Sequence, residues 1–200
     1  MSLKNRTKAM FAEAIMELSK TKSISSISVT DLVNYCDVNR YTFYYHFKDK
    51  YDLLLYIMVN RVKEGFLNAT DDDSIMNPEQ LYDLLLYIKE HKFFFKNAFS
   101  DSSPYSLVRA WNQFMLGLYR RMFMQTLKLE KLPDDLDASI RIMCVGNTGL
   151  VLDWIQADCV EPTEKLVSYM EQNWYRVFGD FDGQVSLKRS FHDYVGTLSD

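Results

Sequence analysis

The segment from residue 27 to residue 55, ISVTDLVNYCDVNRYTFYYHFKDKYDLLL, constrains the fold more than any other part of the chain. Its apolar residues have mixed spacings that fit neither one long helix nor a strand. The spacings become coherent if two short helices meet across a tight turn. Leu32 and Val33 then face inward from the first helix, and Phe43 and Phe47 from the second. The segment therefore predicts a helix-turn-helix unit.

Polar residues mark where these helices begin. Ser28 is a good N-cap, and Asp31 three residues later completes a variant of the capping box and favours the helix dipole. Asn39 can cap the second helix in the same way. Asp37 lies in the turn and tolerates the left-handed backbone conformation better than most residues. Upstream, residues about 4 to 20 carry an apolar stripe at helical spacing, which predicts a third helix behind the other two.

The second short helix, residues 39 to 46, is dense in side chains that hydrogen-bond to bases and phosphates. Phe43 and Phe47 are better interpreted as core. The remaining polar-tipped residues form a nearly unbroken run, and one helix cannot bury all of its sides. We therefore expect this helix to lie in the major groove of double-stranded DNA.

The same residues resemble a known family. The run Thr30-Asp31-Leu32, then Val38, then residues 41 to 50 (YTFYYHFKDK) and Leu53-Leu54 is similar to the DNA-binding domain of the TetR family of bacterial transcriptional regulators, over about residues 8 to 55. Asp37 stands where the family usually has Gly, and Phe43 where it usually has Leu. The resemblance implies base reading by Arg40, Tyr41 and Thr42, and phosphate contacts mainly by Tyr44, His46 and Lys50. The full set of expected DNA-binding residues is Thr30, Asn39, Arg40, Tyr41, Thr42, Tyr44, Tyr45, His46 and Lys50.

Composition favours helices throughout. A chain of 200 residues with 48% hydrophobic residues can bury a large core, and only 7 Gly and 4 Pro leave few interruptions. We expect an all-α fold, with a three-helix DNA-binding domain at residues 1–48 and a larger helical effector-binding and dimerisation domain at residues 49–200. Helices are predicted near residues 49–67, 79–90, 105–129, 133–157 and 162–178. The fold of residues 179–200 is left open.

Charge is unevenly distributed. The chain has a net charge of -4, which is unusual for a compact nucleic-acid-binding domain. Residues 1–52, however, contain 8 Lys and Arg against 6 Asp and Glu, so the acidic excess lies in the remainder. A homodimer would present two such weakly basic domains to DNA and gain by effective concentration.

Two Gly residues support dimerisation. Gly146 and Gly149 lie inside the helix predicted at residues 133–157, where each costs about 1 kcal/mol relative to Ala. Their presence suggests that another backbone comes close. We expect this helix and the one at residues 162–178 to form a four-helix interface in a homodimer, although both could instead complete the core of a monomer.

The second half also resembles part of the family. Residues 84–91 (LLLYIKEH), Phe93-Phe94-Phe95 and residues 149–155 (GLVLDWI) are similar to a C-terminal domain of a TetR subgroup that includes regulators of dihydroxyacetone kinase operons. The resemblance implies an effector, either a small molecule or a protein partner. Aromatic and Met residues dominate ordinary cores as well. The candidate pocket residues are Phe95, Trp111, Phe114, Met115, Tyr119 and Asn147.

Other classes of function find little support. His46, His91 and His192 lack metal-ligand spacing, and no phosphate-binding loop or nucleophile motif is present, so we expect no enzyme, metal or cofactor. No apolar stretch is long enough to span a bilayer, the N-terminus lacks a signal-peptide region, and the three Cys favour a reduced, cytoplasmic protein. The remaining alternative is a helical protein-interaction adaptor or co-regulator without its own operator binding.

Overall fold

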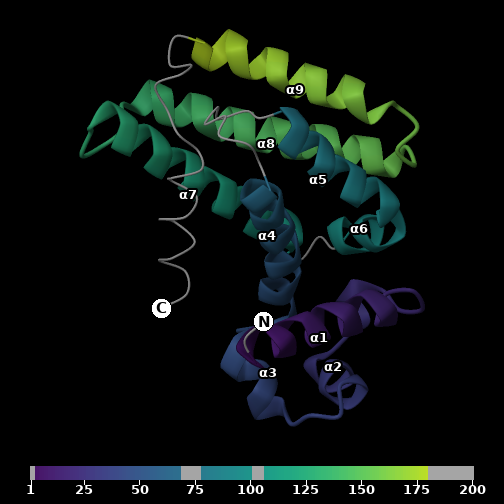
Figure 1. Ribbon diagram of the computed structural model, residues 1–200. Coiled ribbons are helices and arrows are strands. Elements are labelled where there is room, and N and C mark those ends of the chain that lie inside the picture. Colours follow the sequence, from purple (N-terminus) through teal and green to yellow (C-terminus); the bar gives the residue numbers. More distant parts are fainter. Residues whose placement is uncertain (1–2, 69–77, 101–105, 180–200) are drawn as a thin grey trace. The chain divides into compact units, whose positions relative to one another are not determined.

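The computed structural model describes residues 3–68, 78–100 and 106–179 (Figure 1). Within these ranges the chain is α-helical, with one short 3-10 helix and no strand, which confirms the predicted all-α fold. Contacts between residues group the chain into two compact units, one of residues 1–61 with 91–110 and the other of residues 62–90 with 111–200. Residues 180–200, which belong to the segment whose fold the sequence leaves open, lie outside the described ranges.

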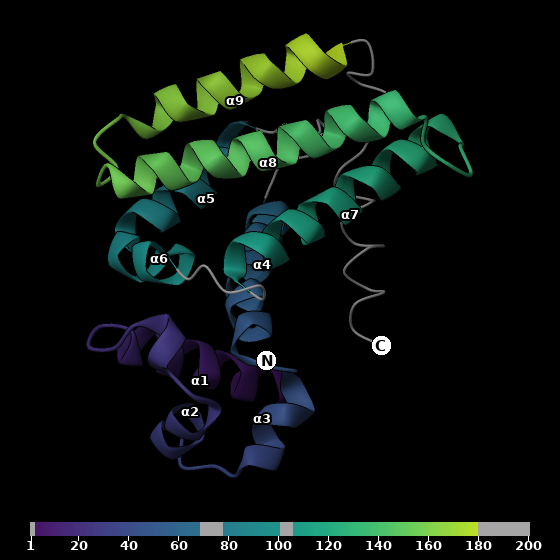
Figure 2. The same cartoon turned by 180° about the vertical axis from the view of Figure 1, so that it is seen from behind.

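The first unit contains the helix-turn-helix. Its elements are α1 (Leu3–Leu18), η1 (Ile24–Ser26), α2 (Val29–Tyr35), α3 (Arg40–His46), the first part of α4 (Lys50–Asn68) and α6 (Lys92–Phe99). Helix α2 packs against both α1 and α3, and the three helices lie together in both views (Figures 1 and 2). The predicted three-helix arrangement is therefore present.

A small aromatic core holds these short helices together. The ring of Phe11 on α1 meets the ring of Phe43 on α3 edge to face, with centroids 5.2 Å apart and planes at 84°. Phe47 adds a second edge contact to Phe11 at 6.3 Å. Leu32 and Val33 of α2 are also buried. The inward-facing residues predicted from the sequence thus form the core.

The helix ends follow the sequence signals. Ser28 caps α2, and the Asp31 carboxylate accepts from the Ser28 backbone N–H, which completes the capping box. Asn39 caps α3 through a bond from the Thr42 N–H to Asn39 Oδ1 at 2.9 Å. The turn between them contains Asp37 with φ of 52°, in the left-handed region. These caps confirm the predicted start of each helix.

The compact units do not follow the predicted division at residue 48. Residues 50–61 of α4 and all of α6 are grouped with the helix-turn-helix. Helix α4 continues past residue 61 into residues of the second unit. The division into a DNA-binding domain at residues 1–48 and an effector-binding and dimerisation domain at residues 49–200 remains a proposal.

The second unit is a set of longer helices. It contains α5 (Pro78–Glu90), most of α7 (Leu107–Leu127), α8 (Asp134–Gln156) and α9 (Thr163–Phe178), whose bounds agree with the predicted helices to within about two residues. Helix α9 contacts both α5 and α8, and α8 and α9 run side by side in Figure 2. Tyr119 and Phe123 of α7 pack their rings against Trp174 of α9. Among the described helices, none is long and apolar enough to cross a membrane.

An ion-paired carboxylate joins α7 to α8. The Arg120 guanidinium donates to both carboxylate oxygens of Asp137, one of them at 2.7 Å from Nη2, and Arg141 Nη2 donates to the same carboxylate at 2.9 Å. The hydrogen bond from Arg120, followed by the one from Arg141, lowers the pKa of Asp137 from its usual 3.8 to about 2, against the opposing effect of burial. The side chain of Asp137 is 21% exposed, so solvent screens the pair only in part.

We expect Asp137→Asn to lower the free energy of unfolding by about 1 kcal/mol at neutral pH, since it removes a charge-assisted pair. The pKa of Asp137 is depressed on folding, so its contribution is complete above its unfolded pKa and is lost as pH falls through about 2. The difference between the wild type and the variant should therefore shrink towards zero in acid. Urea unfolding of both proteins between neutral pH and acid measures it, and a difference that stayed constant with pH would contradict this account.

Candidate nucleic-acid interface

Helix α3 presents a row of polar-tipped side chains to solvent. Arg40 is exposed, and the phenol side chains of Tyr41, Tyr45 and Tyr44 are 77%, 65% and 52% exposed. Phe43 on the same helix is fully buried, so the helix has one core face and one outward face. Three exposed aromatic side chains on a seven-residue helix are more than a solvated face requires. These groups match the residues predicted to contact DNA.

Asn39 and Thr42 also form hydrogen bonds that stabilise the first turn of α3. Asn39 Oδ1 accepts from the Thr42 backbone N–H at 2.9 Å and from the Thr42 hydroxyl at 3.1 Å. The Asn39 amide hydrogens and the Thr42 oxygen lone pairs can still face a partner. The cap therefore fixes the beginning of α3 while leaving both residues able to form further hydrogen bonds.

Thr30 and His46 occupy different settings. Thr30 lies exposed in the first turn of α2. The His46 ring is half-buried and packs edge to face on Tyr45, with centroids 4.9 Å apart. His46 is thus less accessible than the three Tyr side chains of α3, and its predicted phosphate contact stays a prediction.

Lys50 has a structural environment that the sequence did not predict. Its ammonium donates hydrogen bonds to the backbone carbonyl oxygens of Ile24, Ser25 and Ile27, at 2.7, 2.8 and 2.9 Å. An ammonium has three donors, and these three bonds match them. Lys50 thus has a structural role in this unit, and its predicted phosphate contact stays a prediction.

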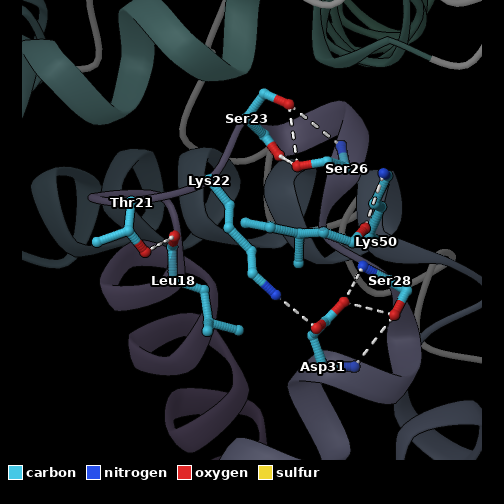
Figure 3. A network of polar contacts seen from close by, with 9 residues as sticks. Leu18, Thr21, Lys22, Ser23, Ser26, Ser28, Asp31 and Lys50 are labelled. Atoms are coloured by element: carbon cyan, nitrogen blue, oxygen red, sulfur yellow. Dashed lines mark hydrogen bonds and ion pairs between the residues drawn. The ribbon is translucent and has the colours of Figure 1, made fainter.

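A second Lys supports the start of α2. Lys22 Nζ donates to the Asp31 carboxylate at 2.7 Å, beside the hydrogen bonds between Asp31 and Ser28 (Figure 3). The hydrogen bond from Lys22, followed by those from Ser28, holds the pKa of Asp31 well below its usual range. Asp31 therefore stays ionised at neutral pH, as the N-terminal end of a helix favours.

The candidate effector residues are described unit by unit, and a pocket formed by them stays a prediction. Phe95 belongs to the first unit and packs on Phe94 and Phe99, whereas the others belong to the second unit. In that unit Trp111 stacks on Phe114, and Tyr119 packs on Trp174. Asn147 lines a groove between α8 and α9 that contains none of the other five candidates. Burial in an apolar setting raises the pKa of the Tyr119 phenol.

Comparison with known families covers both halves of the chain. The family described as "Bacterial regulatory proteins, tetR family" matches residues 12–57, and the one described as "Transcriptional regulator C-terminal region" matches residues 77–175. The first match includes α2 and α3 with their exposed row. The chain belongs to the TetR family of helix-turn-helix, DNA-binding transcriptional regulators. This is a family of transcription regulators and not of enzymes, in agreement with the prediction.

Individual relatives agree with this result. The chain is 29% identical over 93 residues to the HTH-type dhaKLM operon transcriptional activator DhaS of Lactococcus lactis subsp. lactis (strain IL1403); this match covers 46% of the chain and about half, 49%, of that protein. The fold is similar to the solved structure of a dihydroxyacetone kinase operon activator DhaS, with a TM-score of 0.53, 22% identity and coverage of 86% of this chain and 96% of that one. It is also similar to a TetR regulator from Rhodococcus sp. RHA1, with a TM-score of 0.51, 13% identity and coverage of 87% and 97%.

Two substitutions at Asn39 distinguish its role as a helix cap from a role in contacting DNA. We expect Asn39→Ala to lower the free energy of unfolding by about 1 kcal/mol, because the N-terminal cap of α3 is lost. Asn39→Asp keeps the accepting oxygen and should leave stability unchanged, but it adds a negative charge beside the exposed row and should weaken DNA binding. Urea unfolding and fluorescence anisotropy with duplex DNA measure the two effects. Wild-type affinity in Asn39→Asp would show that this end of α3 does not approach DNA.

Proposed function

We propose that the protein is a cytoplasmic homodimer that binds a specific double-stranded DNA operator with α3 in the major groove. The observation that supports this most directly is the outward face of α3, where Arg40 and three Tyr side chains are exposed above a buried aromatic core. Arg40 can form two hydrogen bonds with a guanine edge, and Tyr41 and Thr42 are placed near it on the first turn of α3. The phenols of Tyr44 and Tyr45 would contact phosphates or sugars.

A homodimer accounts for the outer face of α8 and α9. Ile142 and Val145 of α8 are 73% and 55% exposed, and Tyr169 and Val177 of α9 are 40% and 44% exposed. Ile142, Tyr169 and Val177 line a groove of about 550 Å³. This concentration of exposed apolar side chains along two adjacent helices is typical of a protein–protein interface.

The glycines of α8 support the same proposal. A Cβ atom built at Gly146 or Gly149 would meet no other atom within 4 Å, so packing within the single chain does not require glycine at either position. Gly146 lines the groove between α8 and α9. A glycine that costs helix stability yet faces open space fits a place where a second backbone approaches.

Burial narrows which residues could form that interface. Ile140, Trp154 and Leu166, which lie on the same two helices, are buried within the single chain. They belong to the core of the second unit. The exposed residues Ile142, Val145, Tyr169 and Val177 are the better candidates. Core and interface thus use different faces of the same two helices.

The relatives point to a class of target genes. Two similar proteins are named as activators of dihydroxyacetone kinase operons. We therefore propose that this chain regulates an operon of related sugar-kinase function in response to a small-molecule or protein effector bound by the second unit. The competing hypothesis is an adaptor or co-regulator that binds proteins and no operator, and the exposed row of α3 favours DNA.

We expect Arg40→Ala to weaken binding to the specific operator by about 1–3 kcal/mol and to relax the preference at one base pair. Removing a base-reading Arg should affect random duplexes much less than the operator. Fluorescence anisotropy with a duplex selected from a random pool, at fixed salt, measures both affinities. Lys48→Ala, at an exposed Lys just after α3, is the matched control that also removes one positive charge. If Arg40→Ala weakened all duplexes equally, base reading by Arg40 would be wrong, and a wild type that binds no duplex would favour the adaptor.

Gly146→Leu tests the dimer. The new side chain would occupy the groove, so we expect monomers at micromolar concentration in analytical ultracentrifugation and much weaker operator binding. Gly146→Ala should raise the stability of the monomeric fold by up to about 1 kcal/mol, since it improves helix propensity in open space. Val160→Leu adds apolar surface at an exposed residue outside the groove lining and should leave the dimer intact. Dimeric Gly146→Leu would place the interface elsewhere.

A further inference from the structure

We propose that Asn97 of α6 is a positioning residue for DNA binding, an inference that rests on the proposed operator binding. Its side chain holds the segment of residues 19–27 that connects α1 to α2. The Ile24 backbone N–H donates to Asn97 Oδ1 at 2.9 Å. The Asn97 amide nitrogen donates to the carbonyl oxygens of Lys22 at 2.9 Å and Ser19 at 3.2 Å. One carboxamide thus forms three hydrogen bonds to a single short segment.

Lys50 holds the same segment from α4. Its three hydrogen bonds go to the carbonyl oxygens of Ile24, Ser25 and Ile27. The peptide groups at Ile24 are therefore shared: its N–H is bound by Asn97 and its carbonyl oxygen by Lys50. The Ile24 side chain is itself fully buried. Together Asn97 and Lys50 form what we call the segment clamp.

The segment needs this clamp because it contains little regular structure. The only helical element within it is η1, which has three residues. Backbone groups that are buried or half-buried require partners, and a short 3-10 turn supplies few of them. Ser26 and Ile27 find internal acceptors at the Ser23 carbonyl oxygen. The N–H of Ile24 finds its acceptor on Asn97.

The clamp is connected to the helices that face DNA. Lys22 receives a hydrogen bond from Asn97 at its carbonyl oxygen, and its side chain pairs with Asp31 at 2.7 Å. Asp31 completes the capping box at the start of α2, and α2 packs against α3. Contacts to base edges depend on hydrogen-bond geometry that tolerates only small displacements. Loss of the clamp should therefore move or loosen α2 and α3 relative to each other and to DNA.

Asn97 lies far in the sequence from the segment that it holds. Helix α6 lies within residues 77–175, which match the family's C-terminal region, yet it is grouped with the helix-turn-helix unit. Asn97 is 73 residues from Ile24 in the sequence. A polar amide in an otherwise Phe-rich short helix thus supports the DNA-binding helices from outside residues 12–57, which match the DNA-binding family.

The test compares Asn97→Ala, Asn97→Asp and the control Phe93→Ala in the full chain. Phe93 is on the same helix and is 80% exposed. Two quantities are measured: the exchange rate of the Ile24 amide hydrogen by NMR, and operator affinity by anisotropy at a temperature where circular dichroism shows every variant folded. The Ser26 amide, which bonds within the segment, serves as the internal reference.

We expect Asn97→Ala to raise Ile24 exchange at least tenfold relative to Ser26 and to weaken operator binding about tenfold. Asn97→Asp keeps an acceptor for Ile24 but places a carboxylate against two carbonyl oxygens, so Ile24 should stay protected while affinity still falls. Phe93→Ala should change neither quantity. Rescue of Ile24 protection by Asp, but not by Ala, is a result that general destabilisation of the fold would not produce.

Two results would overturn the proposal. Unchanged Ile24 exchange in Asn97→Ala would show that the hydrogen bond does not protect the segment. Normal operator affinity in a folded Asn97→Ala protein would show that the clamp does not position the DNA-binding helices. A wild type without operator affinity would instead overturn the proposed function, and with it the DNA-binding part of this proposal, while the exchange result would still decide whether the clamp exists.

Discussion

The edge-to-face packing of Phe11 with Phe43 is the contact on which the DNA-binding unit depends. Helices α2 and α3 each have seven residues, and helices this short are not stable alone in water. They persist because Phe43, Phe47 and Leu32 are buried against α1. The burial of Phe43 also fixes the rotation of α3, so the polar residues between the buried ones must face outward. The exposed row is therefore a consequence of the core.

Hydrogen bonds add to apolar burial in holding the helix-turn-helix unit together. The caps at Ser28 and Asn39 satisfy the first N–H groups of α2 and α3. In the connection before α2, Ser23 caps η1, and side chains from α4 and α6 bind the peptide groups of Ile24. A unit that binds a rigid partner needs a defined relative position of its elements as well as stability. The polar contacts supply that definition in the segment between α1 and α2, beside the buried side chain of Ile24.

The sequence predicted local features well because their causes are local. Helix periodicity, the capping pair Ser28 and Asp31, and the tolerance of Asp37 for a left-handed turn all depend on residues within a few positions of one another. The roles of Lys50 and Asn97 depend on carbonyl groups 23 to 78 residues away. No local pattern reveals such partners. The polar Asn97 among the Phe residues of α6 is the only local sign that this position makes a polar contact. Lys50 also has the residue type of a phosphate contact, and that role stays a prediction of the family resemblance.

The candidate effector residues and the proposed dimer face show a related limit of sequence-based prediction. Aromatic and Met residues at helical spacing describe a core and a ligand pocket equally well, since both bury apolar surface. The sequence therefore predicts one pocket that includes Phe95 and Asn147. In the structure Phe95 packs on Phe94 and Phe99, and Asn147 lines the groove of α8 and α9. The same ambiguity applies to α8 and α9, whose apolar residues could complete a monomer core or form an interface, and Trp154 and Leu166 are buried in the chain. Exposure separates the two roles within α8 and α9, because a side chain buried within one chain has no surface left for a second chain, whereas Ile142, Val145 and Tyr169 are exposed.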